Sequence, residues 1–155
     1  ELHPGAESSV HLELFPEIPP SWRDEALAAK WRAVRDLRRV VTGCLEKARE
    51  RKEIGSSLQA APVLHATAEA AAVLDGLDLD EIFITSGHVL AAGEVPAEGD
   101  LFRLPDVPQA AVAFRAATGG KCQRCWKVLP EVGTHAHHRM LCMRCADAVD
   151  ASAPG

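Results

Sequence analysis

"SWRDEALAAKWRAVRDLRRVVTGCLEKARERKEIG", residues 21–55, is a stretch in which one apolar pattern continues for more than thirty residues. Its apolar residues recur at spacings of three, four and seven, which places them on one face of a helix: Leu27, Trp31, Val34, Val41, Leu45 and Ala48. Ser21 is the expected N-cap, carboxylates follow it, and basic residues crowd the last turn before Gly55. We therefore expect an amphipathic helix of about nine turns, which needs a partner surface.

The segment that follows, residues 56–118, has the mixed pattern of such a partner. Four stretches are expected as strands, namely "SLQAAPVLHA" (57–66), "EIFITSG" (81–87), "HVLAAGE" (88–94) and "AAVAFRAAT" (110–118). "TAEAAAVLDGL" (67–77) is expected as a short helix that ends near Gly76, and residues 93–109, rich in Gly, Pro and acids, as a loop. The pattern predicts a small mixed α/β layer that receives the long helix.

Residues 1–20 hold four of the ten prolines and show only a brief apolar alternation at Val10, Leu12 and Leu14. This pattern predicts an extended lead-in with one short edge strand. The chain begins with Glu1 rather than Met, which favours a piece excised from a longer protein, although a tag-cleaved or processed protein would look the same.

The last segment, "KCQRCWKVLPEVGTHAHHRMLCMRC" (121–145), contains four of the five cysteines in the pattern C-x2-C-x16-C-x2-C. Two such pairs present four thiolates to one ion in a tetrahedron, and soft sulfur ligands select zinc over hard cations. The predicted zinc ligands are Cys122, Cys125, Cys142 and Cys145. One zinc with all four positions filled is structural, because no site remains for an activated water.

Other potential ligands lie near this pattern or elsewhere in the chain. His135, His137 and His138 sit between the cysteine pairs, and one of them replacing a sulfur is an alternative. Cys44 lies near the apolar stripe of the long helix and is interpreted as a small core residue.

The predicted fold class is therefore α+β, with a long amphipathic helix packed on a small mixed α/β layer and followed by a four-cysteine zinc finger. The expected domain organisation is a lead-in (1–20), the long helix (21–55), the small α/β domain (56–118) and the finger with its tail (119–155). The composition agrees with a globular core, since 47% of the residues are hydrophobic.

The charge is distributed unevenly. The net charge is −5, yet residues 21–54 carry ten Lys and Arg against six Asp and Glu. Net negative charge argues against general nucleic-acid binding, whereas the basic clusters permit local phosphate contact. The candidate RNA-contacting residues are Arg32, Arg35, Arg38 and Arg39 on the helix, and Lys121, Arg124, Trp126, Lys127, Arg139 and Arg144 in the finger. A solvated helix face is the alternative for the first group, and packing inside the finger is the alternative for Trp126.

Several functional classes find no support in the sequence. It contains no Gly-rich phosphate loop, no G-x-S-x-G and no H-E-x-x-H, so no catalytic residues are assigned. No stretch has the length and apolar character of a membrane span or a signal peptide, which predicts a cytoplasmic protein without a membrane partner.

Three stretches in this order resemble the C-terminal region of bacterial isoleucyl-tRNA synthetase: "SVHLELFPEIP" (9–19), "WRAVRDLRRVVTGCLEKARERKEIGSSLQA" (31–60), and "GKCQRCW" with "LCMRC" (120–145). The resemblance implies that residues 21–55 end an anticodon-binding domain and that residues 119–155 form a terminal zinc finger. Cys122, Cys125, Cys142 and Cys145 match the family's zinc ligands, and Trp126 matches the Trp that follows the second ligand.

The resemblance further implies a fragment that contacts the anticodon stem-loop of isoleucine tRNA, with a zinc that supports aminoacylation by a monomeric parent synthetase. Such a fragment would be inactive alone, because the family's ATP-binding signatures and editing domain are absent. Its partners would be isoleucine tRNA and the rest of the parent chain.

Two other functions remain open. One is the zinc-finger module of a DNA glycosylase of the formamidopyrimidine type, although those enzymes use an N-terminal proline and Pro4 is internal here. The other is a purely structural interaction domain in which zinc replaces missing core.

Overall fold

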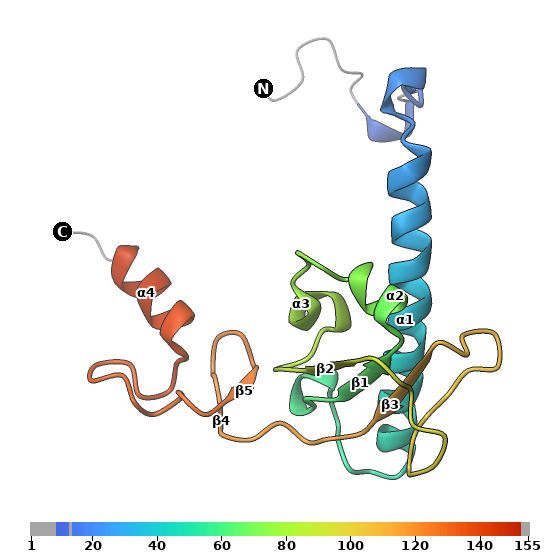
Figure 1. Ribbon diagram of the computed structural model, residues 1–155. Coiled ribbons are helices and arrows are strands. Elements are labelled where there is room, and N and C mark those ends of the chain that lie inside the picture. The colour runs from blue at the N-terminus through green and yellow to red at the C-terminus, as the bar shows by residue number, and fades with distance from the viewer. Residues whose placement is uncertain (1–8, 13, 153–155) are drawn as a thin grey trace.

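The computed structural model describes residues 9–12 and 14–152. A long helix stands against a small sheet, and the chain then crosses to a separate lobe that carries the cysteines (Figure 1). The elements comprise three short 3-10 helices, Val10–Leu12, Pro20–Trp22 and Ser57–Gln59; the helices α1 (Glu25–Glu50), α2 (Ala68–Ala72), α3 (Leu79–Phe83) and α4 (Met143–Ala151); and the strands β1 (Val63–Ala66), β2 (Val89–Ala92), β3 (Ala110–Ala113), β4 (Gly120–Lys121) and β5 (Val128–Leu129). This arrangement confirms the predicted α+β class.

Helix α1 is shorter than its sequence pattern predicts. The carboxylate of Asp24 caps it by accepting a hydrogen bond from the amide of Leu27 at 2.8 Å. The expectation that Ser21 is the N-cap is therefore wrong, since this residue lies in the preceding 3-10 helix, Pro20–Trp22. Asp24 and Ser21 are both good capping residues, and Pro20 starts a separate turn at Ser21. At the other end the helix stops at Glu50, and Arg51 is its C-cap.

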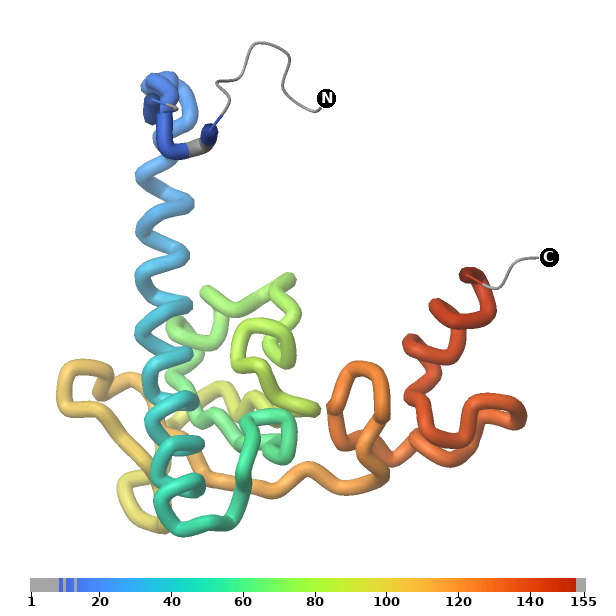
Figure 2. The backbone as a smooth tube through the Cα atoms, turned by 180° about the vertical axis from the view of Figure 1, so that it is seen from behind, coloured from blue at the N-terminus to red at the C-terminus, as the bar shows by residue number. Residues whose placement is uncertain are grey.

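The apolar face of α1 is only partly covered. Its second half is buried and includes Val34, Val41, Leu45 and Ala48 from the predicted stripe, together with Leu37, Val40 and Cys44. The first half is open, because Leu27 is 51% and Trp31 is 38% exposed. Viewed from behind, the N-terminal part of α1 projects beyond the layer (Figure 2). The layer thus buries about half of the stripe that the sequence predicts.

A three-stranded sheet receives α1. Its order is β2-β1-β3, with β1 parallel to β2 and antiparallel to β3. The parallel pair needs a crossover connection, which α2 and α3 provide. Leu64 in β1 and Val112 in β3 are opposite each other and both buried, and they belong to one core with the buried half of α1. The strands predicted within 57–66, 88–94 and 110–118 are thereby confirmed in shortened form.

The segment 81–87, predicted as a strand, is mostly helix and turn. Asp78 caps α3 by accepting a hydrogen bond from the amide of Glu81 at 3.2 Å, and the first turn contains Asp80 and Glu81. Carboxylates at a helix N-terminus favour the helix over the strand that the β-branched residues prefer. The helix ends at Phe83, and its C-cap, Ile84, has a left-handed backbone conformation.

The lead-in also differs from its prediction. A 3-10 helix, Val10–Leu12, replaces the expected edge strand, and no strand occurs in residues 9–12 and 14–24. A strand needs a neighbour for its hydrogen bonds, and the described residues offer none there. The predictions for residues 1–8, including Pro4, and for Glu13 lie outside the described residues.

The last lobe consists of the β4–β5 hairpin, a long loop and α4. Its hairpin is joined to the layer through Ser86, whose hydroxyl accepts a hydrogen bond from the amide of Val128 at 2.7 Å and donates one to the carbonyl of Leu58 at 2.6 Å. Lys127 also forms an ion pair with Glu81 at 2.9 Å. These contacts fix the finger against the end of α3.

Candidate metal centre and basic surfaces

The first cysteine pair lies in a tight backbone loop. The amide of Cys122 donates to the carbonyl of Lys127, and the amide of Trp126 donates to the carbonyl of Cys122, both at 2.9 Å. Trp126 closes this loop with a left-handed backbone, φ 67°. The loop turns Cys122 and Cys125 toward the same side, as the C-x-x-C spacing predicts.

The second pair starts a helix. Cys142 is the N-cap of α4, and its carbonyl accepts hydrogen bonds from the amides of Cys145 and Ala146. Glu131 holds the same helix end by accepting a hydrogen bond from the amide of Met143 at 3.1 Å. The amide of Cys142 donates to the sulfur of Cys122 at 3.4 Å, which joins the two pairs.

The four sulfurs have the geometry of a single metal site. All four lie within 4.8 Å of one another, and the sulfurs of Cys125 and Cys142 are 3.7 Å apart. Two sulfurs at about 2.3 Å from a tetrahedral zinc ion would be about 3.8 Å apart, so the observed spacing fits zinc. Cys122, Cys142 and Cys145 are buried, which leaves little room for a water ligand. These four thiols are therefore arranged to hold one structural zinc.

The environment of the thiols favours a positive ion. The pKa of the Cys122 thiol is lowered to about 6. Burial alone would raise this pKa, but hydrogen bonds from the backbone of Cys125, Cys142 and Arg124 outweigh that effect. Burial raises the pKa of the Cys142 thiol, and side-chain hydrogen bonds with Cys145, Cys125 and Cys122 also raise it. A divalent cation would compensate several thiolates at once and so favour the ionised form of all four cysteines.

Two arginines add positive charge beside the sulfurs. Arg124 Nη1 lies 3.7 Å from the sulfur of Cys145, and a hydrogen bond to Cys125 raises the pKa of Arg144. A zinc ion with four thiolates has a net charge of −2, so these guanidinium groups compensate it. Both residues were predicted to contact RNA from the finger, and the structure places them next to the metal site.

The histidines of the finger have other partners. The Nδ1 atom of His135 accepts hydrogen bonds from the amides of His137 and His138, and Nε2 of His138 lies 2.7 Å from a carboxylate oxygen of Asp150. Within the described residues, the group that could hold a metal contains the four cysteines and no histidine.

Cys44 lies apart from the metal site. It lies on the buried face of α1, where it is 4% exposed, and burial raises its pKa to about 11. Its sulfur is 3.7 Å from the carbonyl oxygen of Val112, where the thiol donates a hydrogen bond. This surrounding agrees with the predicted core role.

Trp126 is an exposed residue of the finger. Its side chain is 61% exposed, and the ammonium of Lys121 lies 5.5 Å from the ring centroid. The interpretation of this residue as the finger's own core is therefore wrong. The packed residues around the cysteines are Leu129, Val132 and Leu141.

The basic residues of α1 fall into two groups. Arg39 forms ion pairs with Asp36 at 3.1 Å and Asp106 at 2.8 Å, and Arg38 donates to the carbonyl of Ile82 at 2.7 Å. Arg32 and Arg35 are exposed and have no hydrogen-bond or ion-pair partner among the described residues. The sequence predicted the same RNA-contacting role for all four arginines, because Asp106, the partner of Arg39, is distant in the chain.

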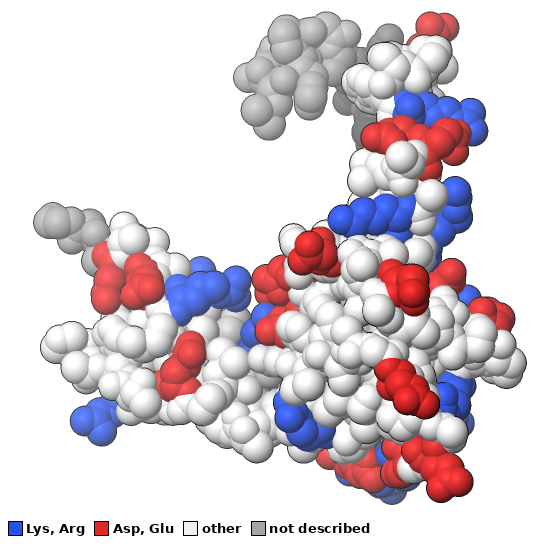
Figure 3. Space-filling view, viewed as in Figure 1, with Lys and Arg blue, Asp and Glu red and all other residues white. Residues whose placement is uncertain are grey.

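Basic side chains also gather on the finger. Figure 3 shows Lys and Arg on the projecting part of α1 and on the finger, on opposite sides of a hollow, with Asp and Glu beside them on both elements and on the layer below. Arg139 is exposed, whereas Lys127 is 17% exposed and paired with Glu81. The exposed cations are thus divided between α1 and the finger.

Sequence reasoning missed Ser86 and Glu81 as the contacts that position the finger. Both lie in the segment predicted as a strand, so their roles depend on the α3 turn.

Among the described helices, none has the length and apolar character needed to cross a membrane.

Comparison with known proteins supports the metal site and extends beyond it. Residues 119–148 match the family model described as "Zinc finger found in FPG and IleRS". Nearly the whole chain is similar to isoleucine-tRNA ligases. The sequence identity is 51% over 96% of the chain for the protein of Ruegeria pomeroyi, 46% over 95% for that of Agrobacterium fabrum and 45% over 96% for that of Bradyrhizobium diazoefficiens. The chain spans 15% of the length of each of these relatives. Residues 119–148 are therefore similar to the zinc finger found in FPG and IleRS, and nearly the whole chain is similar to a part of isoleucine-tRNA ligases.

Proposed function

We propose that this chain is the tRNA-contacting C-terminal part of an isoleucine-tRNA ligase and that it binds the anticodon stem-loop region of isoleucine tRNA. The observation that carries the proposal is the pair of exposed arginines, Arg32 and Arg35, which have no acidic partner among the described residues. A cation without a protein partner is available for a phosphate, and phosphate contacts supply most of the affinity for nucleic acids.

The zinc is proposed to be bound by Cys122, Cys125, Cys142 and Cys145. When bound, it would cross-link the β4–β5 hairpin to the start of α4, because the two cysteine pairs belong to these elements. Its role is structural, and aminoacylation would take place elsewhere in a longer protein.

The finger is proposed to contribute stacking as well as charge. An exposed indole beside a lysine can stack on an unpaired base while the ammonium approaches the phosphate, and Trp126 with Lys121 has this arrangement. The RNA would then occupy the hollow between α1 and the finger.

We also propose the organisation and partners that accompany this role. Residues 21–55 would end the anticodon-binding domain, residues 56–118 would form the small α/β domain, and residues 119–155 would form the terminal finger. The open half of the α1 stripe would pack on the rest of a monomeric, cytoplasmic synthetase. Leu27 and Trp31 support this contact, because large apolar side chains exposed together indicate a missing neighbour.

Fluorescence anisotropy tests the RNA contact. A labelled isoleucine-tRNA anticodon stem-loop is titrated with the zinc-loaded chain, next to an unrelated stem-loop, with and without a zinc chelator. Arg35→Ala should weaken binding and reduce the slope of log affinity against log salt concentration by about one. The ion-paired control Arg39→Ala should change both the affinity and the slope less. Equal affinity for both stem-loops, or equal effects of the two substitutions, would contradict the proposal.

A further inference from the structure

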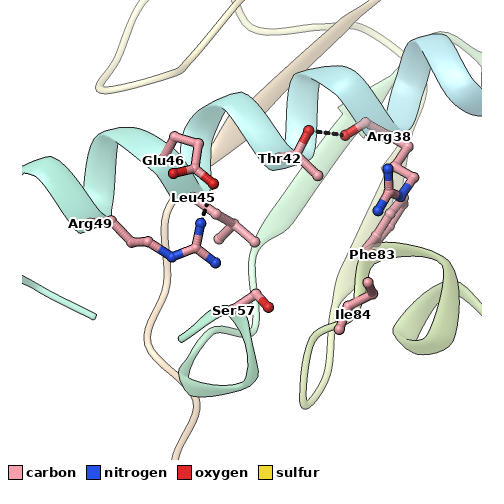
Figure 4. A pocket seen from close by; sticks show the side chains of 8 residues that line it. All are labelled: Arg38, Thr42, Leu45, Glu46, Arg49, Ser57, Phe83 and Ile84. Carbon is pink, nitrogen blue, oxygen red and sulfur yellow. Dashed lines mark hydrogen bonds and ion pairs between the residues drawn. The ribbon is translucent and has the colours of Figure 1, made fainter. Parts of the chain in front are cut away.

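A groove runs along α1 where this helix faces the segment before β1 and the end of α3 (Figure 4). It has a volume of about 170 Å³. It is lined by Arg38, Thr42, Leu45, Glu46, Arg49, Ser57, Phe83 and Ile84. Pockets that enclose a whole drug-sized ligand measure roughly 300–1,000 Å³, so this groove is suited to part of an extended ligand.

The two ends of the groove are cationic. Arg38 and Arg49 are separated by three turns of α1, or roughly 16 Å along its axis. Arg49 lies at the end near Ser57, and Arg38 lies at the end near Phe83 and Ile84 (Figure 4). A compact anion cannot touch both ends, whereas a chain with repeated negative charges can.

Both arginines retain unused hydrogen-bond donors. Arg38 uses its Nε on the carbonyl of Ile82, and Arg49 forms an ion pair with Glu46 through Nη1, which leaves its other N–H groups without a partner within the described part of the chain. The hydroxyl of Ser57 has no hydrogen-bond partner among the described residues. Guanidinium groups with free N–H donors, at the sides of one groove, favour oxygen atoms of phosphate or carboxylate.

The floor between the two ends is apolar. Leu45 and Phe83 are each 1% exposed, whereas the side chain of Ile84 is 51% exposed at the groove. Ile84 has φ 56° and ψ 52°, a left-handed conformation that a β-branched residue rarely adopts. Its amide donates to the carbonyls of Asp80 and Glu81, which hold the aliphatic side chain in this exposed place.

Acceptors are also present between the two arginines. The carboxylate of Glu46 and the hydroxyl oxygen of Thr42 line the same groove. A ribose 2′-hydroxyl can donate a hydrogen bond to such acceptors, and deoxyribose cannot.

We infer that this groove binds the backbone of single-stranded RNA, with non-adjacent phosphates at Arg38 and Arg49 and the intervening sugars over Leu45 and Ile84. The inference rests on the proposed function and gives the path of the RNA along α1. Arg35 precedes Arg38 by three residues on the same helix face, so the path continues onto the projecting part of α1.

An NMR titration of the zinc-loaded chain tests the groove directly. The probes are a 5′-phosphorylated single-stranded RNA trinucleotide, the 5′-phosphorylated DNA trinucleotide of the same sequence, and uridine 5′-monophosphate. We expect the RNA to shift the amide signals of Ser57 and Ile84 and to bind roughly tenfold more tightly than the DNA. Arg49→Gln should weaken RNA binding roughly tenfold. Arg51→Gln, the matched control, should leave it unchanged, because Arg51 pairs with Glu53 outside the groove.

A second variant separates binding from folding. Ile84→Gly relieves the left-handed strain and should raise the urea midpoint, yet it should weaken RNA binding by removing part of the floor. Unchanged RNA affinity in this variant, or equal effects of Arg49→Gln and Arg51→Gln, would overturn the inference. RNA-induced shifts located elsewhere, or tighter binding of uridine 5′-monophosphate than of the trinucleotide, would overturn it as well.

The trinucleotide experiment does not depend on recognition of the anticodon. A trinucleotide that binds in the groove, together with a stem-loop that shows no preference, would reject the proposed tRNA specificity alone. A preferred stem-loop that binds equally well to wild type and Arg49→Gln would reject the groove alone.

Discussion

Replacing Ser86 with Ala tests how the finger is attached to the layer. The Ser86 hydroxyl donates to the carbonyl of Leu58 and accepts from the amide of Val128, and the residue is 6% exposed. The substitution removes both bonds and leaves the carbonyl and the amide without these partners. At about 1–2 kcal/mol for each bond, we expect a loss of about 2–4 kcal/mol in the free energy of unfolding of the joined unit.

Hydrogen exchange and urea unfolding of the zinc-loaded protein measure this effect. The Val128 amide should exchange faster in Ser86→Ala, while the Leu37 amide in the core of α1 should change less. The matched control is Thr85→Val, because the Thr85 hydroxyl is buried and has no hydrogen-bond partner in the described part of the chain. This control should be neutral or stabilising by about 1 kcal/mol. A loss below about 0.5 kcal/mol in Ser86→Ala, on the order of an ordinary surface substitution, would refute the reasoning.

Three further predictions concern the finger and the helix start. Cys142→Ser should abolish amide protection in residues 120–147 but preserve it in α1, because the metal site and the core are separate clusters; loss of protection throughout would contradict this. Gly119→Ala should destabilise the hairpin by about 2 kcal/mol or more in urea unfolding, since its φ is 122° and a Cβ atom would lie 2.3 Å from the Leu129 carbonyl carbon. Asp24→Ala should cost about 1 kcal/mol through loss of the N-cap, measured by circular dichroism in urea, and an unchanged midpoint would indicate that another residue caps the helix.

Elements with strong local patterns were predicted well. The apolar spacing predicted α1 and the burial of Val34 and Leu45, because a helix repeats its faces every 3.6 residues. The strand around Leu64 was also found, although its length was overestimated. The strand predicted for 81–87 was wrong because β-branched residues indicated one structure while Asp78, as an N-cap, favoured another. Local propensities cannot decide such a competition, since neighbouring elements decide which hydrogen bonds can form.

In the candidate site, too, the features with a local sequence pattern were predicted and the features that depend on distant residues were not. The cysteine spacing predicted the four-sulfur cluster, because the pattern itself brings two thiols of each pair together. The pairing of Arg39 with Asp106 and the exposure of Trp126 had no local signal. Both depend on which surfaces meet after folding.

The sequence by itself determined that a long amphipathic helix precedes a small mixed layer and that two cysteine pairs can bind one metal ion. These properties arise from periodicity and spacing over a few residues. Only the tertiary structure decided which half of α1 is covered, which arginines remain without acidic partners, and how Ser86 joins the finger to the layer. These properties arise from contacts between residues distant in the chain, because burial and ion pairing depend on the neighbours that the fold brings together.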